Sequence, residues 1–159
     1  MTRVLYPGSF DPIHNGHVEL AETAASMFDE VVVAVLSNPS KGDGLFNLES
    51  RMILIQESLE HLSNVETTKF DGLVVDLATE VGADFIVKGL RAVSDFEAEL
   101  QMAQMNAALS GVQTLFLPSA SRSSFLASRL IREVVRLGGD VSPMVPAPVR
   151  QRLEGSLDR

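Results

Sequence analysis

Apolar positions along the chain follow two alternating patterns. One pattern is a short, continuous, β-rich run, of which residues 31–36 (VVVAVL) are the clearest case. Such a run is typical of a strand that is buried on both faces of a parallel sheet. The other pattern repeats every three or four residues and indicates an amphipathic helix, as in residues 48–62. The first pattern predicts five strands, over residues 3–6, 31–36, 65–70, 85–87 and 114–117.

The helical pattern occupies the segments between these strands. Helices are predicted at about 16–28, 48–62, 73–81, 96–107 and 126–137, with a last short helix after a proline-rich stretch. Regular alternation of strand and helix predicts an α/β fold: a Rossmann-like, doubly wound, five-stranded parallel sheet with helices on both faces. No repeat or linker interrupts the pattern, so residues 1–159 are expected to form a single domain.

Ligands of such sheets bind beyond the carboxyl ends of the strands. That rule directs attention to the loops at residues 7–17, 37–46, 88–95 and 118–128. The first of them contains most of the chemistry, because His14 and His17 are three residues apart at the predicted start of a helix, where both can face one side. Gly8 permits a tight turn and Ser9 offers a hydroxyl donor. Together with the positive end of the helix, these groups predict a phosphate site.

Other interpretations of this loop remain open. His14 and His17 could be a helix cap and a surface residue, and two histidines with Asp11 nearby are only weak evidence for a metal site. Two of the chain's three histidines lie at this one sheet edge, which favours a functional role.

Composition narrows the classes of function. The chain has no cysteine, which excludes disulfides and thiol nucleophiles. A net charge of −8 argues against nucleic-acid binding, and no apolar run approaches the ~20 residues that span a membrane. The beginning of the sequence lacks the features of a secretory signal, so we expect a cytoplasmic protein. The few cations before residue 90 are candidates for any anion site there: Arg3, Lys41, Arg51, Lys69 and Lys88.

The segment His14-Asn15-Gly16-His17 resembles the HxGH signature of a nucleotidyltransferase superfamily that includes class I aminoacyl-tRNA synthetases. With the preceding Tyr-Pro-Gly-Ser-Phe-Asp-Pro it resembles the bacterial phosphopantetheine adenylyltransferases. Nearly the whole chain takes part in this resemblance. Its further motifs, in order, are Asn38-Pro39-Ser40-Lys41, Lys88-Gly89-Leu90-Arg91, Asp95-Phe96-Glu97, Gln101-Met102-Ala103-Gln104-Met105-Asn106 and Gly138-Gly139-Asp140-Val141.

The resemblance implies transfer of the adenylyl group of ATP to 4'-phosphopantetheine, giving dephospho-CoA and pyrophosphate in coenzyme A biosynthesis. It also implies Mg²⁺ as cofactor, a homohexamer built as a dimer of trimers, and feedback by CoA. Two alternatives remain. The acceptor could be another phosphorylated compound, such as nicotinate mononucleotide or a phosphorylated sugar alcohol. The chain could also be an inactive nucleotide-binding regulatory protein.

The same resemblance assigns roles to individual residues. His17 would stabilise the transition state, with Lys41 and Arg91 as further catalytic groups. The acceptor would contact Ser9, Lys41, Val74 and Lys88. ATP would contact Ser9, Phe10, His17, Gly89, Leu90, Arg91, Glu99, Ser123, Ser124, Phe125, Leu126, Ala127, Ser128 and Arg129.

Each of these assignments has a plainer alternative. Lys41 could be a solvated loop charge, and the Lys88 and Arg91 charges could pair with Asp95 and Glu97. Glu99 could simply face solvent. Val74 belongs to a helical stripe that equally suits core packing, and Ser128 could be a helix cap without ligand contact.

The sequence also departs from the family pattern at four positions. Lys88 stands where the family often has Arg, and Ala98 where it commonly has Tyr. Ala127 and Arg129 replace hydroxyl residues of a run that opens a helix, so Ser128 alone keeps a hydroxyl there. The backbone N–H groups at the start of this helix can bind phosphate whatever the side chains are, and Arg129 could add a cation near the β,γ-phosphates.

Overall fold

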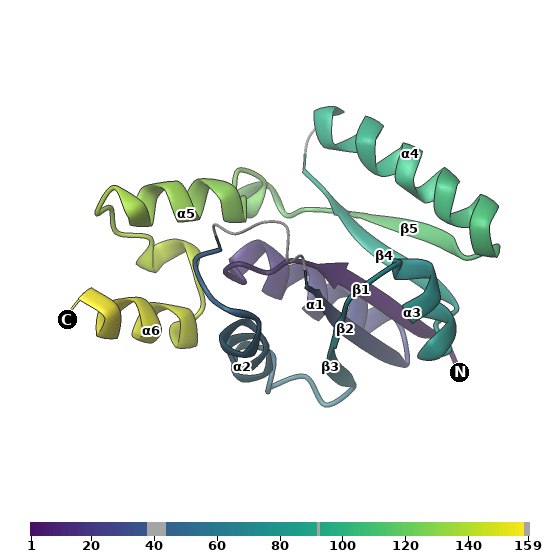
Figure 1. Cartoon of the computed structure of the whole chain (residues 1–159), viewed down its shortest axis with the longest axis horizontal. Coiled ribbons are helices and arrows are strands. Elements are labelled where there is room, and N and C mark those ends of the chain that lie inside the picture. Colours follow the sequence, from purple (N-terminus) through teal and green to yellow (C-terminus); the bar gives the residue numbers. More distant parts are fainter. Residues whose placement is uncertain (38–43, 92, 158–159) are drawn as a thin grey trace.

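The computed structural model describes residues 1–37, 44–91 and 93–157. Strands and helices alternate along this part of the chain, with 3₁₀ turns near the C-terminal end (Figure 1). The strands are β1 (Arg3–Gly8), β2 (Glu30–Leu36), β3 (Val65–Phe70), β4 (Phe85–Leu90) and β5 (Gln113–Pro118). The helices are α1 (Asn15–Met27), α2 (Leu48–Ser58), α3 (Val74–Glu80), α4 (Val93–Ser110), α5 (Ser128–Arg136) and α6 (Ala147–Leu157), with 3₁₀ turns η1 (Ser121–Ser123) and η2 (Ser142–Met144).

All five strands form one parallel sheet in the order β3-β2-β1-β4-β5. The chain therefore runs outward from β1 to β3, returns to the other side of β1, and runs outward again to β5. This is the doubly wound, Rossmann-like arrangement that the alternating pattern predicts, and its switch point lies between β1 and β4.

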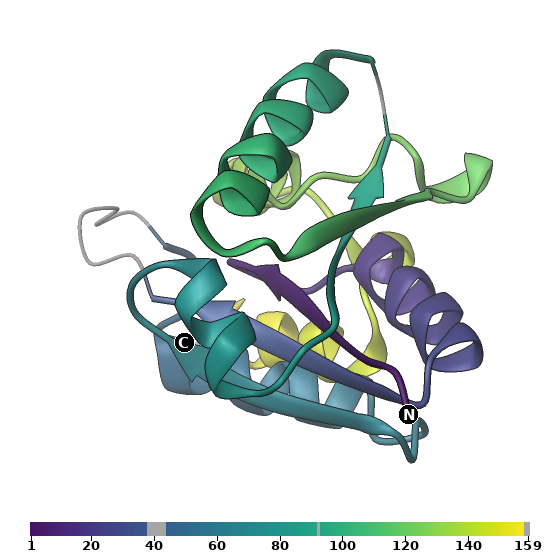
Figure 2. The same cartoon turned by 90° about the vertical axis from the view of Figure 1, so that its right-hand side faces the viewer.

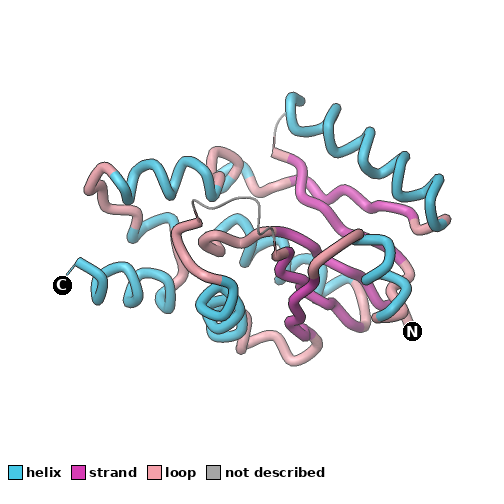
Figure 3. Tube along the Cα trace, viewed as in Figure 1, coloured by secondary structure: helices cyan, strands magenta, loops and turns pink. Residues whose placement is uncertain are grey.

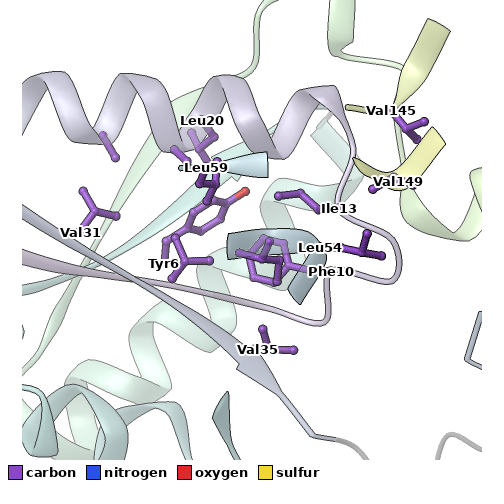
Figure 4. Packing of buried hydrophobic residues seen from close by; sticks show 14 of the residues in the cluster. Tyr6, Phe10, Ile13, Leu20, Val31, Val35, Leu54, Leu59, Val145 and Val149 are labelled. Atoms are coloured by element: carbon purple, nitrogen blue, oxygen red, sulfur yellow. The ribbon is translucent and has the colours of Figure 1, made fainter. Parts of the chain in front are cut away.

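Helices cover both faces of the sheet, with the strands in the middle layer (Figure 3). On one face, buried side chains of α1, α2, α5 and α6 pack against β1, β2 and β4 in the larger apolar cluster. Figure 4 shows Tyr6, Phe10 and Ile13 among its members, together with Leu54 of α2 and Val149 of α6. On the other face a smaller cluster joins Leu77 and Ala78 of α3 to the sheet. Helix α4 packs against β5 and α3.

The two halves of the sheet meet along a short seam. β1 and β2 pair over six residues, from Arg3–Glu30 to Gly8–Val35, whereas β1 and β4 pair only at Val4–Phe85 and Leu5–Ile86. Beyond these pairs the two strands diverge toward their carboxyl ends, and Figure 2 shows β4 and β5 turning away from β1. The divergence opens a wedge at the switch point.

Several helix boundaries differ by a few residues from the sequence prediction, and two of these differences have clear local reasons. The helix predicted over 126–137 begins at Ser128, because Ala127 has extended backbone angles (φ −144°, ψ 136°). The helix predicted over 48–62 ends at Ser58, and Leu59 caps it through its N–H bond to the Ile55 carbonyl. In the described ranges no helix is long and apolar enough to cross a membrane.

Candidate active site

A cavity of about 420 Å³ fills the wedge between β1 and β4. Its walls come from the end of β1 and the loop after it, the start of α1, the end of β4, and the segment from β5 to α5. The lining residues are Tyr6, Pro7, Gly8, Ser9, Phe10, His14, Gly16, His17, Leu20, Lys88, Gly89, Arg91, Ser119, Ser123, Ala127, Ser128 and Arg129. Among these residues there are three cations and no carboxylate, so the cavity suits an anion.

The loop after β1 has an unusual backbone. Phe10 has φ +48°, in the left-handed region that non-glycine residues rarely adopt. Its ring folds back over Gly8, where an added Cβ would lie 3.0 Å from Phe10 Cε2, so a larger residue at that position would require the ring to shift. The next residue, Asp11, is buried, and its carboxylate accepts the N–H groups of Leu45 and Phe46, each at 2.8 Å. The first and second loops are thereby tied together.

His14 and His17 lie at the start of α1 and share its cap. His14 Nδ1 accepts the N–H of Gly16 at 3.0 Å and that of His17 at 3.4 Å, while His17 Nδ1 accepts the N–H of His14 at 3.1 Å. The two rings stack with centroids 3.7 Å apart. An Nδ1 that accepts a hydrogen bond leaves the proton of the neutral imidazole on Nε2. Both rings are therefore set as Nε2–H donors on the cavity wall.

The surroundings keep both imidazoles neutral. Burial lowers the pKa of His14 to about 4, and the Arg91 charge acts in the same direction. Burial, then the neighbouring His14 and Arg91, hold the pKa of His17 well below its usual value. Burial likewise raises the pKa of Tyr6, so its phenol stays protonated. Neutral donors beside fixed cations suit a phosphate group whose negative charge needs stabilisation without proton transfer.

Arg91 connects the β4 loop to the loop before α5. Its Nη1 donates to the Leu126 carbonyl at 2.6 Å, and the guanidinium lines the cavity. Across from it, α5 begins without a side-chain cap at Ala127, and the Ser128 hydroxyl donates to the Pro12 carbonyl at 2.9 Å. The N–H groups of the first turn of α5 therefore have no capping side chain, an arrangement favourable to anions. Arg129, the next residue, lines the cavity beside them.

Lys88 and Glu99 form an ion pair next to the cavity, with Nζ and Oε2 3.5 Å apart. Lys88 is on β4 and Glu99 on α4, the next helix along the chain, so the pair links these two elements. The sequence analysis assigns Lys88 to the acceptor and Glu99 to the nucleotide. In the structure each is the other's partner.

Most of the residues that the sequence analysis singled out meet at this cavity. Those that line it are Ser9, Phe10, His17, Lys88, Gly89, Arg91, Ser123, Ala127, Ser128 and Arg129. Leu126 is buried nearby and holds Arg91 through its carbonyl, whereas Phe125 is 61% exposed. The Ser124 hydroxyl donates to the Ser121 carbonyl. Leu90 ends β4, and its carbonyl accepts the Ser119 N–H.

One predicted acceptor residue does not line the cavity, and another falls outside the part of the chain that the structure describes. Val74 begins α3 and packs against the smaller apolar cluster, as its alternative core role anticipated. Lys41, and with it the Asn38-Pro39-Ser40-Lys41 motif, lies outside the described residues.

The structure also adds residues that the sequence analysis did not assign to a site. Tyr6, Leu20 and Ser119 line the cavity. Ser119 follows β5 directly, and that position alone could have identified it. Tyr6 lies in a strand that is apolar on both faces, so the sequence contains no signal for the direction of its ring.

The described residues offer no protein-ligated metal site. They contain no group of three or more His, Asp or Glu side chains that could hold an ion. The nearest carboxylate of the first loop, Asp11, is occupied by two main-chain N–H groups. Protein ligands for Mg²⁺ are usually carboxylate oxygens, and this donor set does not provide them.

Comparisons with known proteins agree with this architecture. Residues 5–134 match the model of the family described as cytidylyltransferase-like. A lipopolysaccharide core biosynthesis protein from Thermoplasma volcanium GSS1 is similar at 26% identity, with a TM-score of 0.55 over 76% of this chain and 97% of that one. The structure described as "a Putative Nicotinate-nucleotide Adenylyltransferase from Vibrio parahaemolyticus" shares the fold, with a TM-score of 0.66 at 15% identity over 96% and 99% of the two chains.

The matched region contains the whole sheet except the first residues of β1, and all the segments that form the cavity. It thus covers the HxGH histidines, the β4 loop and the start of α5. The chain belongs to the cytidylyltransferase-like family and is a nucleotidyltransferase.

Proposed function

We propose that this protein is a pantetheine-phosphate adenylyltransferase, which transfers the adenylyl group of ATP to 4'-phosphopantetheine. The observation that supports it most directly is the cavity at the switch point, where a neutral histidine pair faces Lys88, Arg91 and Arg129. Phosphoryl chemistry depends mainly on positioning and charge stabilisation, and these groups supply both.

The proposed step is an in-line displacement at the α-phosphorus of ATP. A phosphate oxygen of the acceptor forms the new P–O bond while the bond to the bridging oxygen of the β-phosphate breaks. Dephospho-CoA and pyrophosphate leave, and the protein forms no covalent intermediate. A phosphate dianion needs no general base, so neutral imidazoles that donate hydrogen bonds are better suited here than imidazoles that accept protons.

The individual residues take the following roles in this proposal. The Nε2–H of His17 stabilises charge that develops on the α-phosphoryl oxygens. Ser9, Lys88 and Lys41 orient the acceptor phosphate. Arg91, Gly89 and the start of α5 hold the triphosphate, and Glu99 accepts hydrogen bonds from the ribose hydroxyls. Mg²⁺ enters bound to the phosphate oxygens of ATP, as part of the substrate.

The choice of acceptor rests on the ordered motifs of the sequence. A nicotinate mononucleotide acceptor is the second candidate, and the fold shared with the Vibrio parahaemolyticus structure supports keeping it. A regulatory protein that binds nucleotide without turnover is the third, because Ala98, Ala127 and Arg129 depart from the family pattern.

We propose further that the chain assembles as a homohexamer. Helices α4 and α5 each present a row of exposed apolar side chains, and such rows commonly mark interfaces. They are Met102, Met105 and Leu109 on α4, Leu130 and Val134 on α5, and Leu137 at the C-cap of α5. Sedimentation of the purified chain, with Met105→Glu as the disrupting variant, tests this assembly.

The decisive experiment supplies ATP and Mg²⁺ with one acceptor at a time and follows pyrophosphate. We expect turnover with 4'-phosphopantetheine and none with nicotinate mononucleotide or a phosphorylated sugar alcohol. Turnover with one of the other acceptors would support the second candidate. Nucleotide binding without pyrophosphate release from any acceptor would support the third.

A further inference from the structure

Two guanidinium groups flank the peptide of Phe10. Arg51 of α2 donates from Nη1 to the Ser9 carbonyl at 2.7 Å, and Arg132 of α5 donates from Nη1 to the Asp11 carbonyl, also at 2.7 Å. Both arginines are partly buried, and neither lines the cavity. They approach the loop from separate helices, so the carbonyls on both sides of Phe10 are held in place.

Phe10, the first of the two residues between these carbonyls, has the unfavourable backbone conformation. A φ of +48° is disfavoured for an aromatic residue, and it persists only where surrounding contacts impose it. The direction of the Asp11 carbonyl relative to the Ser9 carbonyl depends on φ and ψ of Phe10 and of Asp11. Hydrogen bonds from Arg51 and Arg132 to those carbonyls therefore favour the left-handed conformation of Phe10 over the ordinary ones.

The Phe10 ring contacts His17, the candidate catalytic residue, so the backbone conformation of Phe10 affects the position of the His17 ring. The ring is 3% exposed and meets the His17 ring edge-on, with centroids 4.8 Å apart. It meets Tyr6 in the same manner at 5.3 Å. If residue 10 returned to a negative φ, its ring would leave this position, and the His17 ring would lose this contact.

We propose that Arg51 and Arg132 are positioning residues, which hold Phe10 in its left-handed conformation so that its ring fixes the orientation of His17. The inference rests on the proposed function only in taking His17 as the group that acts on the phosphate. Arg51 also reaches the Leu36 carbonyl at the end of β2, at 3.4 Å, so it ties the loop to the sheet as well as to α2.

The test compares Arg51→Met and Arg132→Met with a matched control. Arg3 also donates from Nη1 to a main-chain carbonyl, that of Val81 at 2.8 Å, but it lies at the amino end of β1. Arg3→Met removes the same charge and a similar bond. In imidazole ¹H–¹⁵N spectra without substrate, we expect the His17 signals to shift in the two test variants and to stay unchanged in Arg3→Met.

Steady-state kinetics give the second readout. Arg51→Met and Arg132→Met should lower kcat by about 10- to 100-fold while KM for ATP changes less than about threefold. Arg3→Met should leave both constants near the wild-type values. If a methionine variant does not fold, the lysine variant at that position keeps a donor and should show both a smaller loss of kcat and a smaller His17 shift.

A double-mutant cycle identifies the route of the effect. In a protein that already carries Phe10→Leu, adding Arg132→Met should lower kcat by less than about a further twofold, because both changes remove the same support of the His17 ring. Any of three results would overturn the proposal. The losses of kcat caused by Phe10→Leu and Arg132→Met could multiply in the double variant, the His17 spectrum could stay unchanged in the test variants, or Arg3→Met could lower kcat as much as they do. If the wild-type chain transfers no adenylyl group to phosphopantetheine, the proposed function fails, and the spectra still decide this inference.

Discussion

His14 and His17 cap one another: the Nδ1 of each imidazole accepts the main-chain N–H of the other residue, at 3.4 Å and 3.1 Å. This exchange fixes both ring orientations and both tautomers through the backbone of a single helical turn. The first turn of α1 therefore also forms one wall of the cavity, so substitutions in this turn affect both the stability of the protein and the chemistry of the site.

Replacing His17 by Ala should impair turnover far more than ATP binding. The Nε2–H donor is needed most when charge builds on the transferring phosphoryl group, so kcat should fall by about 10²- to 10³-fold while Kd for ATP changes less than about threefold. Rapid-quench kinetics and calorimetry measure the two quantities. His61→Ala, at an exposed histidine, is the control. Equal losses in binding and turnover would contradict the assigned role.

The buried histidines make stability depend on pH in a defined window. Unfolded imidazoles bind protons below about pH 6.5, whereas folded His14 does so only near its pKa of about 4, and the pKa of His17 is also lowered. Between these values the unfolded state holds more protons. Stability is therefore complete above pH 6.5 and falls as pH decreases toward 4, by roughly 3 kcal/mol for His14.

Urea titrations at a series of pH values measure this dependence. His14→Asn should flatten the slope between pH 6.5 and 4, while His61→Gln should retain it. A free energy of unfolding that stays constant across the window in the wild-type protein would show that the imidazoles are protonated in the folded state.

Gly16→Ala should destabilise the protein although alanine is the better helix former. An added Cβ would lie 2.9 Å from His14 Cε1 and 3.0 Å from its Nδ1, and the stacked His17 ring limits how far His14 can move. We expect a loss of about 1–3 kcal/mol, as for other overpacked sites. Gly155→Ala on α6, where nothing lies within 4 Å, should instead stabilise by up to about 1 kcal/mol. Thermal unfolding compares the two, and a gain in both variants would contradict the clash.

Glu99→Gln should affect the two substrates in opposite directions. If Lys88 binds the acceptor phosphate as proposed, Glu99 competes with that phosphate for the ammonium, so removing the carboxylate should tighten phosphopantetheine binding by about two- to fivefold. ATP binding should weaken, because the ribose hydroxyls exchange a charged carboxylate acceptor for a neutral amide oxygen and its amino group. Glu97→Gln, an exposed change of the same charge on the same helix, is the control. If the affinities for phosphopantetheine and ATP both rose or both fell, these assigned roles of Lys88 and Glu99 would be wrong.

Arg129→Ser tests the unusual start of α5. The serine restores the hydroxyl typical of the family but removes one of the cations of the cavity. If Arg129 contacts the β,γ-phosphates, KM for ATP should rise by about three- to tenfold and KM for the acceptor should stay nearly constant. Arg136→Ser, at the other end of α5, removes the same charge outside the cavity lining. A KM for ATP that stays the same or falls would show that the hydroxyl serves better than the cation.

The order of elements and the position of the cavity could be predicted from the sequence. Continuous apolar runs, such as the one in β2, indicate parallel strands regardless of tertiary detail, and their carboxyl ends meet at one edge. Ser9 and Arg91 directly follow strands, Lys88 lies near the end of β4, and His17 lies in the first turn of the helix after β1. The topology therefore brings them to one edge of the sheet.

Residues whose role depends on three-dimensional packing could not be predicted. Glu99 lies on α4, and its distance from Lys88 depends on how that helix lies over the sheet. Val74 lies at the start of a helix that covers the face opposite α1, and helical spacing does not distinguish the two faces. Arg51 and Arg132 bind main-chain carbonyls, which leave no trace in the pattern of side chains.

The short seam between β1 and β4 has a consequence for folding as well as for binding. Only two residue pairs join the strands at this point, so the half-sheet of β4 and β5 depends on few backbone bonds for its attachment to the rest. A ligand that hydrogen-bonds to the end of β1 and to the end of β4 would add links between these two strands. Substrate occupancy should then hold the two halves of the molecule together, and the empty protein should open first along this line.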